Sequence, residues 1–586
     1  MRNLSLSLLL ALAGLPVVAA AALAPSTAHA QDVFATPLVQ LLPPGNVIGD
    51  GITSVTMNVV ALNADGTSMD GIKGKLSASA GTASALTERG GGLYSFTWTP
   101  PQVSSSTEVS FTLKAKDAAK DNVQKTWSVM VSPAMPSAIT VSANPSELIL
   151  GQDGTSSLSI KLHTADGTPV EGKDLTIRAA AGSVQAVTYL GSGAFTARYT
   201  PKGVNYPHLD IITVADARDP EQAYGSFVVR LSGKTDFPVT AGPNANVIVR
   251  VAGRDFGPYT ADTTGRVSVP IHVSPGAEAT LVEIKDGQTT EDALDLKLPP
   301  TRRLALFPTW QAVAGDSGRP VPVRVAVSLP DGSPDSSAKL TIKASQGSVG
   351  AVTHEGGGVY SAMWSPPSLV TAAEVEISAR LDGASDVQSD SFKIQVQPAP
   401  AQGISMVPEP RELAAGATGF KVYTKVQGPG GKGIADQDIV YITQGASAAG
   451  TKDLKSGDYQ SSFRTTGAES VQVTAMAAGA PSGNPLAGLV LVAPEGRVAN
   501  DGGSTGVVLV AVDAFGYPVP NVTVDLKVQG DGKVTNQVTT DAHGAAVLYF
   551  TSGRTAGVST IQARVGEAYG SLSLLQAPAG ALPGFA

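Results

Sequence analysis

A short pattern of large side chains behind a glycine recurs five times along this chain of 586 residues. In each copy an aromatic residue stands six positions after the glycine, and at least one further bulky residue stands at another even offset. Because successive side chains of a β-strand point to opposite faces, even offsets place these side chains on one face. Each copy therefore predicts the core strand of one β domain. The five marker glycines and their aromatic partners are Gly92 and Trp98, Gly193 and Tyr199, Gly358 and Trp364, Gly457 and Phe463, and Gly544 and Phe550.

A turn precedes each marker glycine at a nearly constant distance, which is identical in the first four copies and slightly longer in the last. A predicted hairpin closes three of the copies. The copies thus have about seven short alternating strands per ~100 residues, which is typical of an antiparallel sandwich of immunoglobulin type. We therefore predict an all-β fold, a tandem and elongated array of Ig-like antiparallel β-sandwich domains. The predicted hairpins are 109–115 with 126–131, 211–215 with 225–231, and 375–379 with 392–396.

The spacing of the marker glycines predicts the number of domains. Most neighbouring markers are separated by about the length of one Ig-like domain, ~100 residues, and the last pair lies somewhat closer together. The separation of Gly193 and Gly358 is more than half as long again. One short β unit therefore fits between these two. The predicted divisions are a signal peptide at 1–30, Ig-like domains at 31–132, 137–233, 299–397, 398–480 and 486–577, a short β-sandwich domain at 234–298, and a flexible tail at 578–586.

Short joints separate the predicted domains, for example at 132–137, 232–234 and 479–486. Most of them contain proline, which restricts the relative motion of the neighbouring domains. We therefore expect an elongated and rather stiff array. Six sandwiches of about 35 Å placed end to end reach about 200 Å.

Residues 1–30 have the pattern of a cleavable export signal. Arg2 is the only charge, residues 6–24 are almost wholly apolar, and Ala28-His29-Ala30 supplies small residues at the cleavage position. A membrane anchor is the alternative, but Gly14, Pro16 and the cleavage site favour removal. No later segment approaches the ~20 apolar residues that span a bilayer. The predicted location is the periplasm, the outer membrane as a peripheral protein, or the cell surface and exterior.

Composition excludes several kinds of partner and site. The formal net charge is −8 and becomes −9 without Arg2, and no cluster of basic residues is visible, which argues against nucleic acid. The chain has no cysteine. Disulfides and thiolate metal sites are therefore excluded, and each predicted domain depends on its hydrophobic core.

Three stretches near the C-terminus carry a family resemblance. They are an Asp-x-x-Gly turn with Pro and Val after it (513–519), a Thr-Asp-x-x-Gly-x-Ala strand start (540–546) and an Ala-Gly-x-x-x-Ile-x-Ala strand (556–563). Over residues 490–577 the chain resembles the bacterial Ig-like domains of the invasin and intimin family, and the similarity is weaker in 137–231 and 301–397 and faint in 403–478. The resemblance implies an Ig-like sandwich and a surface or envelope role that is often adhesive.

Two patterns suggest catalysis, and each has a structural interpretation that we prefer. Gly315-Asp316-Ser317-Gly318 is similar to the nucleophile segment of chymotrypsin-like proteases. The same position in other copies is a turn, and neither nearby histidine has a protease-like context. The histidines after the signal do not have metal-ligand spacing either. They are His163, His208, His272, His354 and His543.

Carboxylates near the closing hairpins suggest calcium that stiffens the domain joints, but Asp residues also simply form turns. The aromatic series suggests sugar-binding platforms, but the even offsets favour packing in the core. We therefore predict no catalytic, cofactor-binding or metal-binding residues and no cofactor. The carboxylate pairs are Asp117 and Asp121, Asp216 and Asp219, and Asp382 and Asp386.

The sequence thus predicts a non-enzymatic exported protein that acts as an elongated spacer, adhesive or interaction protein at the cell surface or in the envelope. Its partner is an unidentified protein or surface glycan, bound by ends and loops of the first or last domain. The alternative is a structural scaffold subunit, periplasmic or associated with the outer membrane, of a larger secretion, motility or surface-layer assembly. No transmembrane segment remains after cleavage of the predicted signal.

Overall fold

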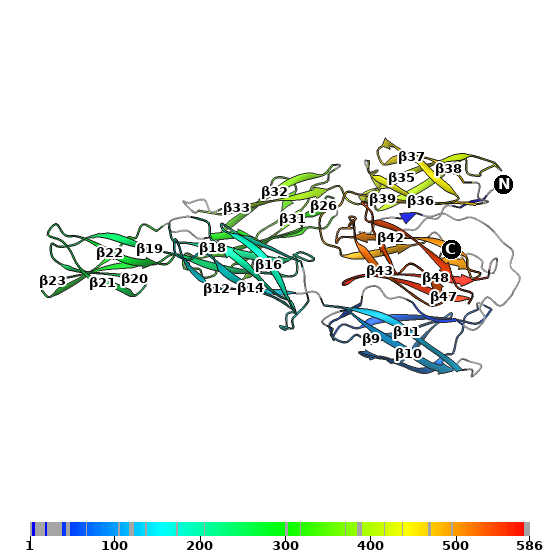
Figure 1. Cartoon of the computed structure of the whole chain (residues 1–586), viewed down its shortest axis with the longest axis horizontal. Coiled ribbons are helices and arrows are strands. Elements are labelled where there is room, and N and C mark those ends of the chain that lie inside the picture. Colours follow the sequence, from blue (N-terminus) through cyan, green and yellow to red (C-terminus); the bar gives the residue numbers. More distant parts are fainter. Residues whose placement is uncertain are drawn as a thin grey trace.

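The computed structural model of this chain consists of β-strands and the turns and loops that connect them (Figure 1). Among the residues that it describes, no helix has the length and apolar character needed to cross a membrane. Most of the predicted signal peptide and nearly all of the predicted tail lie outside the described residues. The described residues are 3–5, 18–19, 38–42, 47–65, 67–103, 106–116, 122–134, 137–171, 174–203, 206–298, 303–316, 318–369, 371–383, 389–414, 416–435, 437–466, 470–493 and 496–578.

The strands pair into successive two-sheet sandwiches, numbered here in chain order. The first sandwich contains β3 (Leu38–Leu41), β4 (Val47–Gly49), β5 (Val55–Leu62), β6 (Lys73–Ala78), β7 (Thr82–Ala83), β8 (Thr87–Gly90), β9 (Leu93–Thr99), β10 (Thr107–Lys116) and β11 (Asn122–Pro133). The second contains β12 (Ala138–Asn144), β13 (Glu147–Ile149), β14 (Ser156–His163), β15 (Leu175–Ala179), β16 (Ser183–Gly191), β17 (Ala194–Thr200), β18 (His208–Asp216) and the first half of β19 (Tyr224–Thr240). The third contains the second half of β19 with β20 (Asn246–Val251), β21 (Arg254–Thr260), β22 (Arg266–Val273), β23 (Ala279–Lys285) and β24 (Gln288–Leu294).

Three further sandwiches follow. The fourth contains β25 (Arg303–Leu306), β26 (Ala312–Ala314), β27 (Val321–Ser328), β28 (Leu340–Ala344), β29 (Ser348–Val349), β30 (Thr353–Gly356), β31 (Val359–Ser365), β32 (Ala373–Leu381) and β33 (Ser389–Gln397). The fifth contains β34 (Gly403–Glu409), β35 (Gly419–Gln427), the 3-10 turn η1 (Pro429–Gly431), β36 (Asp438–Gln444), β37 (Ala446–Lys455), β38 (Asp458–Thr465) and β39 (Ser470–Ala478). The sixth contains β40 (Gly488–Val492), β41 (Arg497–Ala499), β42 (Ser504–Val512), β43 (Thr523–Gln529), β44 (Gly532–Lys533), β45 (Gln537–Thr539), β46 (Ala545–Ser552), β47 (Gly557–Val565) and β48 (Ala568–Ala577).

The second sandwich illustrates the shared topology. One sheet has the order β12-β14-β17-β16, and the other has the order β13-β19-β18-β15. The short strand β13 pairs with β19 in parallel, whereas β18 and β19 form an antiparallel hairpin. The first, fourth and sixth sandwiches repeat this arrangement, which confirms the predicted fold class. The three predicted closing hairpins are the pairs β10–β11, β18–β19 and β32–β33.

The aromatic residues of the marker strands lie in the cores, as predicted. Trp98, Tyr199, Trp364 and Phe550 are each 0% exposed, and Phe463 is 2% exposed. Burial of side chains of this size supplies much of the hydrophobic stabilisation of each sandwich. The interpretation of these rings as sugar-binding platforms is therefore wrong.

A tyrosine two residues after the marker glycine ties each of three core strands to a neighbouring turn. In the fourth sandwich the Tyr360 hydroxyl accepts a hydrogen bond from the backbone N–H of Ala338 (2.9 Å) and donates one to the carbonyl oxygen of Asp335 (3.0 Å). Tyr94 and Tyr459 make the same pair of bonds in the first and fifth sandwiches. Each buried hydroxyl is thereby satisfied as donor and as acceptor.

The ring six residues after the glycine also holds a turn in place. The indole N–H of Trp364 donates to the carbonyl oxygen of Gln346 at 3.0 Å, and Trp98 does the same in the first sandwich. In the second sandwich Tyr199 donates to the carboxylate of Asp210 at 2.8 Å, and this carboxylate accepts the backbone N–H groups of Ala181 and Gly182. Burial, and then the charge of Asp210, raise the pKa of the Tyr199 hydroxyl.

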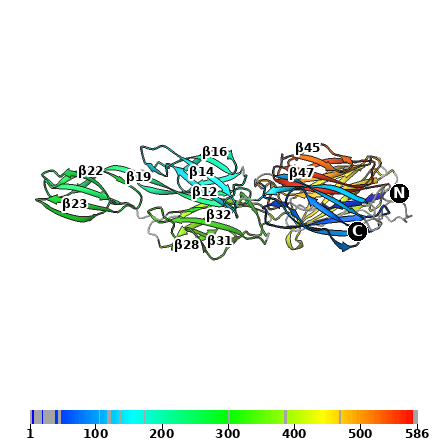
Figure 2. The same ribbon diagram turned by 90° about the horizontal axis from the view of Figure 1, so that it is seen from below.

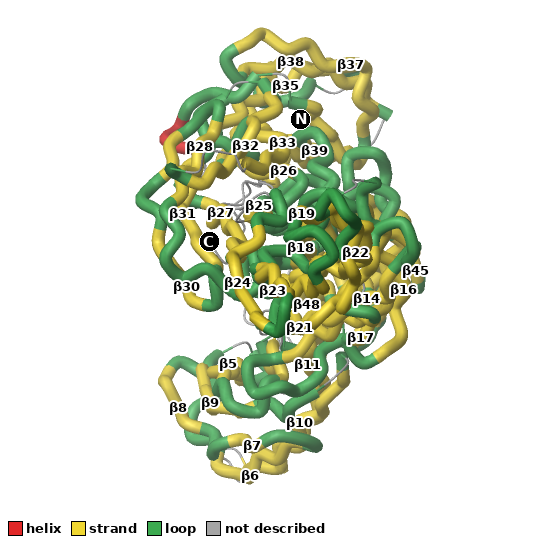
Figure 3. The backbone as a smooth tube through the Cα atoms, turned by 90° about the vertical axis from the view of Figure 1, so that its left-hand side faces the viewer, coloured by secondary structure: helices red, strands yellow, loops and turns green. Residues whose placement is uncertain are grey.

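The sandwiches do not lie end to end, so that expectation is wrong, although the molecule is elongated (Figures 1 and 2). The second and fourth sandwiches lie side by side and share an apolar cluster that includes Ile211 and Phe307. Arg178 of the second sandwich forms two hydrogen bonds of 2.5 Å with the carboxylate of Asp390 in the fourth. The third sandwich forms one end of the long axis, and the first, fifth and sixth gather at the other (Figures 1 and 2). Seen along this axis, the first and fifth sandwiches lie on opposite sides of the molecule (Figure 3).

The joint predicted as a linker at 232–234 lies inside a strand. β19 runs unbroken from Tyr224 to Thr240, pairing first with β18 and then with β22. A single strand that belongs to two sheets fixes the direction of the second relative to the first, because its backbone hydrogen bonds resist bending. This joint is therefore stiffer than a short linker.

We predict that substitution of a marker glycine by alanine destabilises its sandwich more than the positive φ angle alone would, because another backbone segment lies close to the glycine. Gly358 and Gly383 lie in the same sandwich, and both have φ +74°. A Cβ at Gly358 would lie 2.5 Å from the carbonyl oxygen of Val327, whereas no atom lies within 4 Å of a Cβ at Gly383. Gly383→Ala should therefore cost only the backbone strain of about 1–2 kcal/mol, whereas Gly358→Ala should cost at least ~3 kcal/mol.

Native-state hydrogen exchange of the β31 amides in the full chain measures this difference. Equal losses of protection in the two variants would contradict the proposed role of the backbone contact.

Candidate functional site

The described residues of the protease-like segment, Gly315, Asp316 and Gly318, include two that form local hydrogen bonds. The backbone N–H of Gly315 donates to the carbonyl oxygen of Gln397 at 2.8 Å, and the carboxylate of Asp316 accepts the Ser368 hydroxyl at 3.0 Å. Ser317 lies outside the described residues. The two histidines considered with this turn have other neighbours, since the ring of His354 packs on Tyr360 and His272 lies 3.8 Å from a carboxylate oxygen of Glu147.

The predicted carboxylate pairs have different surroundings. Asp216 is held by the guanidinium of Arg218 at 2.7 Å. Asp219 accepts the backbone N–H of Glu221, and burial together with the charge of Glu221 raises its pKa. Asp382 accepts the hydroxyl of Thr341, while Asp117, Asp121 and Asp386 lie outside the described residues. The described part of the chain contains no group of three His, Asp or Glu residues placed to hold a metal ion.

The remaining histidines take part in local contacts. The ring of His163 lies 2.7 Å from the hydroxyl of Thr140. Burial lowers the pKa of His208, whose Nδ1 lies 2.9 Å from the carbonyl oxygen of Tyr206. His543 lies at the edge of the sixth sandwich, 3.4 Å from Asp438 of the fifth.

A polar cluster supports the joint at which β19 passes from the second to the third sandwich. The carboxylate of Glu147 accepts the hydroxyls of Ser232 and Ser274, the second at 3.0 Å. Ser274 belongs to the third sandwich and Glu147 to the second, so the carboxylate links the two across the joint. A turn of the third sandwich also approaches the fourth, where a Cβ at Gly276 would lie 2.8 Å from the backbone of Pro330.

The third sandwich therefore projects from a supported base, and we name it the distal sandwich. Its larger sheet has the order β21-β20-β23-β24, and both edge strands are mostly exposed. On this sheet the guanidinium of Arg250 lies 2.7 Å from Asp255 and 3.1 Å from Glu291. Tyr259 is 38% exposed on β21. The sheet thus offers a polar surface with one exposed aromatic ring and two free edges.

A second set of contacts holds together the second and fourth sandwiches, which support the distal sandwich, and the sixth sandwich. The carboxylate of Glu221 in the second sandwich accepts the indole N–H of Trp310 at 2.7 Å and pairs with Arg319 at 3.0 Å, both in the fourth. The ring of Trp310 meets Phe515 of the sixth sandwich edge-on, with centroids 5.2 Å apart. Three sandwiches therefore converge on this one cluster.

The predicted linker at 479–486 is part of the same region. Asn484 is 4% exposed, accepts the backbone N–H of Gln311, and donates to Ala312 and Asp513. The hydroxyl of Tyr517 donates to the carbonyl oxygen of Pro398 at 2.9 Å, and burial followed by the charge of Asp513 raises its pKa. This joint is packed between the fourth and sixth sandwiches.

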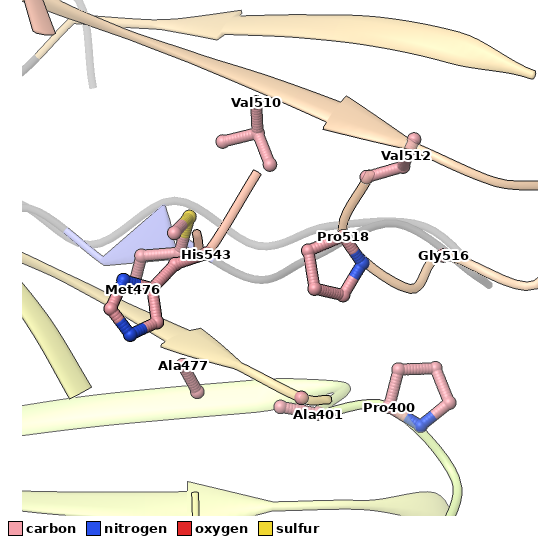
Figure 4. Close-up of a pocket in the computed structure, with 10 residues that line it drawn as sticks. Pro400, Ala401, Met476, Ala477, Val510, Val512, Gly516, Pro518 and His543 are labelled. Carbon is pink, nitrogen blue, oxygen red and sulfur yellow. The ribbon is translucent and has the colours of Figure 1, made fainter. Parts of the chain in front are cut away.

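The hollow between the fifth and sixth sandwiches is too small for a ligand. Figure 4 shows Met476 and Ala477 of β39 facing Val510 and Val512 of β42, with His543 at one side. The cavity is about 10 Å³, which is about the space of one water. A larger cleft of about 500 Å³ lies between the second and fourth sandwiches, beside Ile211 and Arg230.

Comparison with family models identifies the domain type of the sixth sandwich. Residues 488–573 match the family model of the bacterial Ig-like domain (group 1). A search of curated proteins found no match to this chain.

Solved structures of adhesins are among those that match. The Escherichia coli adhesin FdeC is 16% identical, with 63% of this chain and 99% of that chain covered and a TM-score of 0.22. Invasin, described as a bacterial integrin-binding protein, is 10% identical, with 75% and 79% covered and a TM-score of 0.24. The D00-D0 domain of intimin is 11% identical, with 46% and 98% covered and a TM-score of 0.20.

The family match covers nearly the same stretch as the one in which the sequence resemblance is clearest. The resemblance predicted from the sequence is therefore confirmed, and this chain is similar to the bacterial Ig-like domain proteins, with the family match at residues 488–573.

Proposed function

We propose that this chain is an exported, non-enzymatic Ig-like protein that acts as a rigid spacer and adhesive or interaction protein at the cell surface or in the envelope. It consists of six β domains with the boundaries predicted from the sequence. The distal sandwich at 234–298 meets the partner, a protein or a surface glycan. The protein has no cofactor and no metal, and it does not bind nucleic acid.

The observation that carries this proposal is the support of the distal sandwich. β19 enters it without a break, Glu147 braces the joint, and the second and fourth sandwiches form a double base beneath it (Figure 2). A protein that presents a surface at a distance gains from such rigidity, because less conformational freedom is lost when the partner binds.

The sequence predicts that the first or last domain binds the partner, whereas we place the binding surface on the distal sandwich. Those two sandwiches pack against each other at the other end of the long axis, where Ser132 of the first donates to the backbone of Glu567 in the sixth (Figure 1). The distal sandwich instead exposes most of its larger sheet. It contains nine acidic and six basic residues, a balance that favours neutral or weakly basic partners over polyanions.

The alternative function is a structural scaffold subunit of a larger envelope assembly. One observation favours it: an edge of β39 in the fifth sandwich has no partner strand from that sandwich.

We predict that the distal sandwich keeps a fixed position relative to the sixth. Because the chain has no cysteine, Thr289→Cys and Thr523→Cys introduce a single pair of spin labels at exposed positions. Pulsed electron resonance should give one narrow distance distribution. Insertion of Gly-Gly-Ser after Gly233 should broaden it at least twofold, because the insertion interrupts β19.

The matched control is the same insertion after Gly253, in a turn of the distal sandwich with no atom near its Cβ position. This insertion should leave the distribution narrow. A broad distribution in the unmodified pair would contradict the rigid support.

Export and exposure are tested in the native cells. The mature chain should begin at Gln31, which intact-mass measurement determines, and protease added to intact cells should digest it. A periplasmic protein serves as the protected control. Protection of this chain in intact cells with digestion after lysis would contradict the surface role and favour the scaffold.

A further inference from the structure

The fifth sandwich lacks its last strand. In the first, second, fourth and sixth sandwiches, the strand that follows the marker strand continues into an antiparallel partner, and these pairs are β10–β11, β18–β19, β32–β33 and β47–β48. After β39 the chain enters residues 479–487, all of them described and none in a strand, and it then forms β40 of the sixth sandwich. One edge of β39 therefore has no partner from its own sandwich.

Two short strands from the N-terminal segment occupy that edge. Asn3–Ser5 (β1) pairs with β39 in parallel, and Val18–Ala19 (β2) pairs with it antiparallel. Ala475 of β39 has Tyr441 of β36 on one side and Ala19 on the other, so β2 lies on the edge opposite β36. The pale blue arrow beside Met476 in Figure 4 belongs to this part of the chain.

β2 takes the place of the missing strand. In the complete second and sixth sandwiches the last strand contacts the first strand of the facing sheet, as β19 contacts β12 and β48 contacts β40. β2 contacts β34, the first strand of the fifth sandwich, in the same way. The edge of β39 therefore accepts a strand from outside the fifth sandwich. That strand lies where the last strand of a complete sandwich lies.

The side chains of β39 determine which kind of strand can pair with its edge. Val471, Val473 and Ala475 are buried in the two core clusters of the fifth sandwich. Met476 points to the opposite face and packs with Val508 and Val510 of the sixth sandwich. A strand laid beside β39 continues both of these apolar faces, so it needs apolar residues at consecutive positions rather than at alternate ones. The run at 6–24, in which β2 lies, has this character.

Removal of residues 1–30 empties the edge, so this inference rests on the export proposed above. The segment 31–37 cannot refill it. From β39 to β3 the path crosses the sheets of β42 and β47, which is three sheet spacings of about 10 Å each, or roughly 30 Å. A fully extended segment of this length reaches at most about 25 Å.

The stretch 579–586 of a second copy is poorly suited to supply this strand. Residues 579–586 contain Pro583 and two glycines, which weaken or interrupt strands. We therefore assign the occupant to a different polypeptide.

We propose that the open edge of β39 is an acceptor site for an extended apolar strand of another protein, about six residues long and free of proline and charge. The added strand pairs with β39 through backbone hydrogen bonds and completes the fifth sandwich, which is recognition by β-strand addition. The unpaired edge would otherwise expose backbone donors and acceptors and promote aggregation. An acceptor site of this kind joins the chain to an envelope assembly.

A cross-linking experiment tests the site in the exported mature chain. The probe is a synthetic peptide of residues 17–24, with Ala19→Cys and two added lysines for solubility. The mature chain carries Ala475→Cys, the residue that pairs with Ala19. The matched control carries Asp438→Cys, an exposed position at the end of β36 on the opposite side of the same sheet. Under mild oxidation the mixed disulfide should form at least ten times faster with Ala475→Cys than with Asp438→Cys.

Hydrogen exchange supplies a second measurement on the chain without substitutions. Addition of the peptide without its cysteine should slow exchange of the β39 amides at least tenfold. Equal disulfide rates in the two variants, or unchanged exchange in β39, would overturn the proposal. Disulfide dimers of Ala475→Cys that form without peptide would show that a second copy is the occupant and overturn the choice of partner.

The test separates this inference from the proposed function. If intact mass shows that the protein keeps residues 1–30, the proposed removal of these residues fails. The acceptor edge is then tested within one chain, where Ala19→Cys and Ala475→Cys should form an internal disulfide and Ala19→Cys with Asp438→Cys should not. Absence of the internal disulfide would overturn the acceptor edge itself.

Discussion

Backbone N–H and C=O groups at the edges of β-sheets need partners, and the way in which this chain supplies them determines its shape. In four sandwiches a short parallel strand such as β13 covers the edge of the last strand. In the third sandwich, β19 continues from the second sandwich and pairs with β22. In the fifth, the last strand is missing and N-terminal strands take its place. Rigid joints and an acceptor edge thus arise from the same requirement.

The cores were predictable from the sequence because they follow a local periodicity. The glycine must approach a backbone oxygen, as Gly358 approaches Val327, and the ring six residues later must point inward, as Trp364 does. These two demands fix residue types at fixed spacing, so they are visible in any copy. The family resemblance at the C-terminus has the same origin, since it rests on turn residues such as Asp513, whose carboxylate accepts the N–H groups of Phe515 and Tyr517.

The arrangement of the sandwiches and the candidate surfaces were not predictable in this way. The packing of the second sandwich on the fourth depends on single residues, Arg178 with Asp390 and Glu221 with Trp310, which follow no repeat. The distal position of the third sandwich follows from that packing. The missing strand did leave a signal, because the markers of the fifth and sixth sandwiches lie closer together in the sequence than any other neighbouring pair. The shortfall is about the length of one strand and its turn.

The side-by-side packing of the second and fourth sandwiches is the central claim, since the distal position of the third depends on it. Small-angle X-ray scattering of the mature chain tests it most directly. Along the long axis the molecule has three levels, namely the third sandwich, then the second and fourth side by side, and then the first, fifth and sixth. With sandwiches about 35 Å long, this arrangement predicts a maximum dimension of about 105 Å. A maximum dimension of about 200 Å, which is the length of six sandwiches end to end, would contradict this account.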